Sequence, residues 1–139
     1  MKQLVYRDGG LMTSGTGGEA AAAMGMAVSR VSQAAAAGAT LVAGKDILPG
    51  ATLVRTGAGG VAYSDTLPTG TLMDAAFPTV AIGESFEMTI ANHVAAVATI
   101  VAGATHTVVA GSLTAIPASS SAKFIFTRTA ATVWTYEQI

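Results

Sequence analysis

The sequence contains no cysteine and few charged side chains. The lack of cysteine excludes disulfide bonds, thiolate nucleophiles and cysteine-ligated metal sites. Charged residues make up 11% of the 139 residues, and the net charge is −1. The seven basic residues occur singly and form no stripe that could neutralise phosphates, so we expect no nucleic-acid partner.

Large apolar residues are also scarcer than the hydrophobic share of 51% suggests. Alanine accounts for 29 of these residues, whereas Leu, Ile, Val and Phe together number 32. This composition suits one domain with an appendage. A chain with so few charges has difficulty covering its exterior, so we expect other copies or a larger assembly to cover much of it. The alternative is a monomer with a surface of Ala, Thr, Ser and Gly.

No segment has the pattern of a secretion signal or a membrane span. Charges interrupt Met1–Asp8 before any apolar core forms, which argues against a signal peptide. The uncharged run between Glu87 and Lys123 contains Asn92 and Pro117 and alternates like strands. We therefore expect no transmembrane helix and no membrane partner.

Composition divides the chain near residue 45, because residues 9–44 are dominated by Ala, Gly, Ser, Thr and Met. Glu19–Ala37 could be helical, because Ala is the best helix former and Met24, Val28 and Val31 recur at helical spacing. An apolar stripe this thin anchors a helix poorly. We interpret residues 1–45 as an N-terminal arm, extended or partly helical, that becomes ordered against a partner and makes assembly contacts. The alternative is a helix packed on its own domain.

Residues 46–139 have the pattern of a β domain. Apolar residues alternate with polar ones in Ser85–Ala91, Lys123–Arg128 and Ala131–Glu137, so each segment predicts a strand with one buried face. Further short strands are expected at 51–55, 61–63, 97–102, 105–110 and 113–116, with the glycines at 57–60 forming a hairpin between the first two.

One short helix interrupts these strands. Thr69 or Thr71 can act as its N-cap, the residues up to Phe77 give two turns, and Pro78 ends it. Strands at such short, regular spacing indicate a sandwich or a barrel. The predicted fold is therefore mainly β: an antiparallel β-sandwich or barrel over residues 46–139 with one short helix, preceded by the Ala/Gly-rich arm.

Residues suited to catalysis or metal binding do not form a recognisable set. His93 and His106 are the only histidines, and nothing near them has the ligand spacing of a zinc site, so a structural or solvent-facing role is expected for both. Glu84 and Glu87 lie three apart in strand-like sequence, which directs them to opposite faces and prevents them from flanking one bond.

Nucleophile and phosphate motifs are equally incomplete. Ser14 and Ser64 lack the glycine context and the accompanying His and Asp of a catalytic serine. The Gly15–Glu19 segment lacks the Lys-Ser/Thr end of a P-loop and the strand that precedes a dinucleotide site. We therefore expect that the protein is not an enzyme, and predict no catalytic, cofactor-binding or metal-binding residues and no cofactor.

Trp134 and Tyr136 lie on the same face of the last predicted strand. Such a pair can form a flat platform for sugars. The alternative, which we favour, is that both rings cap the core or a seam between subunits.

Several segments of the β domain together resemble a recurring pattern in virion proteins of tailed bacteriophages. That pattern has a D-T-L/T-P-T element, a short Ala-rich helix, a V/I-G-D/E-S-F-x-F strand ending near Asn, a Thr/Val/Ala/Gly-rich hairpin region, and a final aromatic-bearing strand pair. The corresponding segments are Asp65–Thr69, the helix ending Ala76-Phe77-Pro78, Ile82–Glu87 with Ile90–Asn92, Ala98–Gly103 with Val108–Ser112, and Ser121–Phe124 with Val133–Tyr136. The similarity covers roughly residues 45–139, and His93 and Val94 depart from it by replacing a polar turn.

This resemblance is to capsid decoration (cement) proteins and to related β domains of fibres and spikes. It implies a structural protein on the capsid exterior of a virion, made in the host cytoplasm, that stabilises the shell. The implied partners are the major capsid protein of the same phage and further copies of this chain, as a homotrimer. The alternative is a receptor-binding or structural module of a tail fibre or spike.

Overall fold

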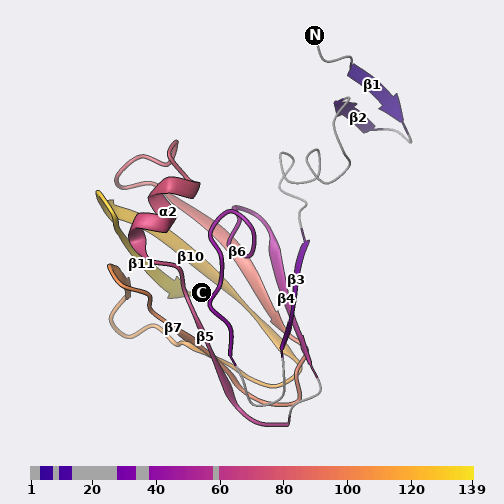
Figure 1. Ribbon diagram of the computed structural model, residues 1–139, viewed down its shortest axis with the longest axis vertical. Coiled ribbons are helices and arrows are strands. Elements are labelled where there is room, and N and C mark those ends of the chain that lie inside the picture. Colours follow the sequence, from indigo (N-terminus) through magenta and orange to yellow (C-terminus); the bar gives the residue numbers. More distant parts are fainter. Residues whose placement is uncertain (1–3, 8–9, 14–27, 34–37, 58–59) are drawn as a thin grey trace.

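The structure, a computed structural model, describes the backbone of residues 4–7, 10–13, 28–33, 38–57 and 60–139, and the side chains of the last two ranges. The chain is mainly β, with one short helix in the described part, as the sequence predicts. A six-stranded sheet consists, in order, of β3 (Val28–Gln33), β4 (Thr52–Gly57), β6 (Ser85–Asn92), β10 (Ser120–Ala130), β11 (Val133–Gln138) and β8 (His106–Val108). A three-stranded sheet consists of β5 (Tyr63–Thr66), β7 (Ala98–Val101) and β9 (Ala115–Ile116). Figure 1 shows the two sheets as the layers of an open sandwich, not a closed barrel.

Strand pairing is mixed, so the prediction of an antiparallel domain is only partly correct. The central pairs β6–β10 and β10–β11 are antiparallel, as is β7–β9. In contrast, β3–β4, β4–β6, β5–β7 and β8–β11 are parallel. Parallel neighbours need long connections, and the segment between β4 and β6 provides one because it carries β5 and the helix. Alternation along each strand predicts a buried face but not the direction of its neighbour.

The expected hairpin at 57–60 is also wrong. β4 and β5 do not pair with each other; β4 joins the larger sheet and β5 the smaller one. The chain therefore crosses from one layer to the other at these glycines. A glycine-rich segment permits this crossing as readily as a tight turn, so the sequence alone did not distinguish the two.

The helix α2 (Gly70–Ala76) lies at one end of the sandwich, beside β11 (Figure 1). Thr69 is its N-cap and accepts a hydrogen bond from the backbone N–H of Leu72 at 3.3 Å, which confirms one of the two predicted caps. A side chain at Gly70 would meet the carbonyl oxygen of Thr132, since a Cβ built there lies 1.9 Å from it. The first turn of α2 therefore sits directly on the β10–β11 turn.

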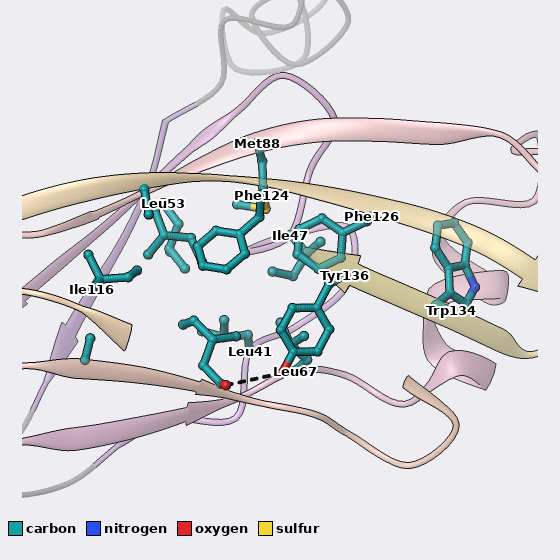
Figure 2. Close-up of a cluster of buried hydrophobic side chains, with 14 of the residues drawn as sticks. Leu41, Ile47, Leu53, Leu67, Met88, Ile116, Phe124, Phe126, Trp134 and Tyr136 are labelled. Carbon is teal, nitrogen blue, oxygen red and sulfur yellow. Dashed lines mark hydrogen bonds between the residues drawn. The ribbon is translucent and has the colours of Figure 1, made fainter. Parts of the chain in front are cut away.

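The core lies between the two sheets. Its largest members include Phe124, Phe126, Trp134 and Tyr136, which extend from β10 and β11 and are at most 2% exposed. Figure 2 shows the rings of Phe124 and Tyr136 directed toward Leu41 and the smaller sheet. Other fully buried large apolar residues include Ile47, Leu53, Leu67, Met73, Met88, Ile90, Val94, Ile100 and Ile116.

Part of the predicted arm belongs to this core. Leu41 is 1% exposed, and its backbone N–H donates to the carbonyl of Thr66 at 2.8 Å. Farther toward the N-terminus, Val28–Gln33 forms strand β3, so these residues are extended and not helical. A two-stranded antiparallel sheet pairs β1 (Leu4–Arg7) with β2 (Gly10–Thr13). The rest of the predicted arm lies outside the described residues, and its role in assembly stays a prediction.

Candidate functional site

The two histidines have different surroundings. His93 is exposed just after β6. His106, at the start of β8, is 1% exposed and packs edge-on against the rings of Phe126 and Tyr136. Its Nδ1 lies 3.2 Å from the carbonyl oxygen of Pro68, an acceptor, so Nδ1 carries the proton and donates. Its Nε2 is buried without a hydrogen-bond partner within the described part of the chain. Burial lowers the pKa of His106, so the ring is neutral at pH 7.

The other residues considered for chemistry do not converge. Glu84 is exposed and accepts a hydrogen bond from Ala81 N–H, whereas Glu87 pairs with Lys123 at 3.4 Å on the surface of the larger sheet. Ser64 is exposed on β5. Ser14 and the Gly15–Glu19 segment lie outside the described residues. Where side chains are described, no three His, Asp or Glu residues gather as metal ligands would.

Trp134 and Tyr136 form no exposed platform. They are 0% and 2% exposed, so the favoured interpretation of two core rings is confirmed and a sugar site on this pair is excluded in this fold. Tyr136 Oη donates to the carbonyl of Ile100 at 3.3 Å, a bond that joins the larger sheet to the smaller one (Figure 2). Burial raises the pKa of Tyr136, which keeps this phenol protonated.

Sequence reasoning missed a buried ion pair between the sheets. Arg55 on β4 and Asp65 on β5 are both fully buried, with Nε to Oδ2 at 2.5 Å and Nη2 to Oδ1 at 2.9 Å. Asp65 also accepts from the backbone N–H of Ala39, and the Arg55 guanidinium lies 5.2 Å from the centroid of the Tyr63 ring. The alternation of 51–55 offered no signal for this pair, since a polar residue in a strand normally faces water.

Asn92, at the end of β6, has a buried side chain with several hydrogen-bond partners. Its Nδ2 lies within hydrogen-bond distance of three carbonyl oxygens, those of Ala96 (2.8 Å), Ile116 (3.1 Å) and Pro117 (3.0 Å). Its Oδ1 accepts from the Tyr63 hydroxyl at 2.8 Å and from the N–H of Val94 at 3.2 Å. One amide group thereby ties β6 to β5 and to the loops flanking β7 and β9.

A third polar cluster fixes α2 to the β10–β11 hairpin. Asp74 accepts from Trp134 Nε1 (2.7 Å), from Arg128 Nη2 (2.6 Å) and from the backbone N–H of Thr132 (2.9 Å). Arg128 also donates to the carbonyl of Val80 at 2.8 Å. Partial burial raises the pKa of Asp74, but the donors from Thr132, Trp134 and Arg128 outweigh it and leave the pKa below the ordinary range. All three clusters join separate elements of the fold.

The surface is the remaining candidate for function, because its described part exposes aliphatic side chains and few charges. Of the charged side chains in 38–57 and 60–139, three are buried, namely Asp46, Arg55 and Asp65, and Asp74 with Arg128 forms the paired cluster described above. The surface charges are Lys45, Glu84, Glu87, Lys123 and the half-buried Glu137. Against these, ten large aliphatic side chains are exposed: Val42, Val61, Leu72, Ile82, Val97, Val101, Val108, Val109, Leu113 and Ile139.

A shallow apolar groove holds two of these aliphatic residues. Val42 lies on one wall, formed by Thr40–Ala43, and Leu72 lies on the other, formed by α2 with Ala75 and Ala76. The groove offers no charged group to a ligand, so its chemistry is that of a contact surface and not of a reaction site.

Comparison with protein-family models, with curated proteins and with solved structures finds no match for this chain. Within the part that the structure describes, no helix is long and apolar enough to cross a membrane. The polar clusters of the interior stabilise the fold. The charge-poor exterior, with its exposed aliphatic side chains, is the candidate binding surface.

Proposed function

We propose that this protein is a structural component of a virion, a decoration protein that binds the outer surface of a phage head and stabilises the shell. The observation that carries the proposal is the imbalance of the described surface: ten exposed large aliphatic side chains accompany four exposed charged ones, namely Lys45, Glu84, Glu87 and Lys123. A soluble monomer keeps exposed apolar patches small, so a surface of this kind suits a protein that works inside an assembly. The resemblance of residues 45–139 to virion proteins of tailed bacteriophages suggests that this assembly is a phage particle.

The mechanism is thermodynamic. A protein that binds only the assembled shell stabilises it by mass action, in proportion to its affinity and concentration. A homotrimer multiplies weak contacts, because the second and third contacts become intramolecular once the first has formed. The major capsid protein is the partner in this proposal, and the N-terminal arm supplies part of the attachment.

The interior agrees with a passive role. The buried Arg55–Asp65 pair, the Asn92 network and the Asp74 cluster each connect separate elements, which favours one rigid arrangement of the two sheets. A rigid domain loses little conformational entropy when it docks.

Copy number in purified particles tests the proposal. Quantitative mass spectrometry of virions that contain this chain should give hundreds of copies per particle, as a lattice of capsid sites requires. A few to a few tens of copies would instead place the chain in a tail fibre or spike. Absence from particles that package the corresponding genome would refute both assignments.

A further inference from the structure

A single buried side chain anchors a long segment of the β domain. Between Ile100 and Ile116, which are both buried, every residue is exposed or half-buried except His106. We define these residues as the 101–115 segment. It runs from the last residue of β7 to the first residue of β9 and contains all of β8. The other two residues of β8, Thr107 and Val108, are exposed, so His106 is the only side chain that holds β8 in the interior.

The surroundings of this anchor favour a neutral imidazole. The rings of Phe126 on β10 and Tyr136 on β11 lie 5.7 and 5.5 Å from the His106 ring, measured between centroids. Nδ1 donates to the carbonyl of Pro68, in the loop before α2. A second proton, on Nε2, would place a positive charge among aromatic rings. Burial of a charge without an ionic partner is costly.

The elements packed around His106 offer it no counter-ion among the described residues. The loop before α2 carries no charge. On α2, Asp74 accepts hydrogen bonds within its own cluster, and the charged residue of β10 in that cluster, Arg128, is a cation. On β11, the phenol of Tyr136 is protonated and donates to a backbone carbonyl. Glu137 is half-buried and follows Tyr136 in the strand, so it points to the opposite face of the sheet.

We propose that His106 is an acid-sensitive anchor, whose protonation releases the 101–115 segment from the sandwich while the other strands stay paired. Local release is possible because β8 is the terminal strand of the larger sheet and, in the described part of that sheet, pairs with β11 alone. Thr105, beside the anchor, has a φ of 56°, which is unfavourable for a β-branched residue and is relieved on release. In water the imidazole regains its ordinary pKa of 6.5, so acid favours the open form.

Release uncovers surface that the closed form hides. Phe126 and Tyr136, which are 0% and 2% exposed, lose their cover of the His106 ring. The edge of β11 also becomes free, because Val109 N–H no longer donates to the carbonyl of Tyr136. Acid therefore exposes an apolar surface and an unpaired strand edge at the same place. The inference concerns the β domain alone and does not depend on the proposed function.

Amide hydrogen exchange of the full-length chain, followed by NMR at about pH 7.5 and about pH 5.0, tests the anchor. The reporters are the amides of Val109, which donates to Tyr136, and of Trp134, which donates to Thr105. After correction for the intrinsic effect of pH on exchange, their protection should fall about 30-fold, because a released imidazole is almost fully protonated at the lower pH.

A control amide distinguishes local release from unfolding of the whole domain. Thr89 N–H donates to the carbonyl of Ala51, beside the β4–β6 pair. The reporters should be less protected than this amide at both pH values. Low concentrations of urea should leave the reporters unchanged and reduce the protection of Thr89, since local opening exposes little surface. Reporters that match Thr89 in protection and in urea dependence would overturn the inference, because β8 would then open only with the whole domain.

Two variants assign the effect to one residue. His106→Gln does not titrate, and its amide can still donate to the Pro68 carbonyl, so the change in protection should shrink to less than about 2-fold. The matched control His93→Gln alters the exposed histidine and should retain the full change. If His106→Gln fails to fold, His106→Phe replaces it with the same expectation. Unchanged protection of the wild-type reporters at the lower pH would overturn the inference, as would a full change that persists without His106.

Discussion

Replacing Asn92 should strongly destabilise the fold, because this one side chain joins several elements. The Asn92→Ala substitution removes a fully buried amide whose Nδ2 shares two protons among three carbonyl oxygens and whose Oδ1 accepts two hydrogen bonds. It leaves three carbonyl oxygens, the Tyr63 hydroxyl and the Val94 N–H without this partner. A buried polar group that loses its partner costs about 1–3 kcal/mol, although carbonyls with a second acceptor site lose less.

We expect a loss of about 4 kcal/mol in the free energy of unfolding. This loss is a large part of the total free energy of unfolding of a typical domain, which is about 5–15 kcal/mol. Urea unfolding followed by tryptophan fluorescence measures it, since the only tryptophan is the buried Trp134. With a slope of about 1.5 kcal/mol per molar urea, the midpoint should fall by about 2.5 M at unchanged slope.

Two variants calibrate the result. Tyr63→Phe removes one of the two hydrogen bonds that Asn92 Oδ1 accepts, and should lower the free energy of unfolding by about 1 kcal/mol. His93→Ala alters the exposed neighbour of Asn92 and should change the midpoint very little. An Asn92→Ala loss no larger than that of Tyr63→Phe would refute the reasoning, because the amide would then not act as a shared partner for several elements.

Three further perturbations test the other clusters by the same unfolding assay. Arg55→Met or Asp65→Leu alone should lower the free energy of unfolding by about 3–5 kcal/mol, because each leaves a buried charge without its partner. The double variant should lose clearly less than the sum of the two single losses. Additive losses would contradict a coupled pair. Because burial lowers the pKa of His106 below its ordinary value of 6.5, the unfolded chain binds the extra proton first, so stability should fall as the pH drops below about 6.5. His106→Phe should abolish this fall in stability below about pH 6.5, and His93→Gln should leave it in place. The reverse result would count against assigning the fall to His106. The lowered pKa of Asp74 implies a stabilisation that is present above the ordinary aspartate pKa and is lost as the pH falls through the folded value, so Asp74→Asn should flatten the most acidic part of the curve.

The strands could be predicted where one face of a segment is buried and the other is wet. The alternation of Phe124 and Phe126 with Ile125 and Thr127 gave β10 its position, and the buried members are those expected. The helix was equally visible, because a threonine cap and a proline enclose it. What alternation does not encode is the neighbour of each strand. The parallel pairs depend on connections that cross between layers, and nothing in a strand of four to six residues records the direction of its partner.

The buried polar residues could not be predicted from the sequence for a related reason. Arg55 and Asp65 are ten residues apart on strands of different sheets, so their pairing appears only when the sheets are stacked. His106 resembled any other polar residue beside a turn, although it lies among aromatic rings. Burial of a polar side chain follows from three-dimensional packing, whereas the one-dimensional pattern predicts only that polar residues are usually exposed.

The residues that carry the family resemblance have mainly architectural roles in this fold. Asp65 holds Arg55 between the sheets, Thr69 caps α2, and Asn92 joins the ends of several elements. A pattern that consists of such residues reflects the requirements of folding. It does not predict which residues of the surface contact a partner. The exposed aliphatic residues, on which our proposal of an assembly contact depends, are therefore independent of this pattern. This separation implies that substitutions of Asn92 lower the unfolding midpoint, whereas substitutions of exposed aliphatic residues such as Leu113 leave it nearly unchanged.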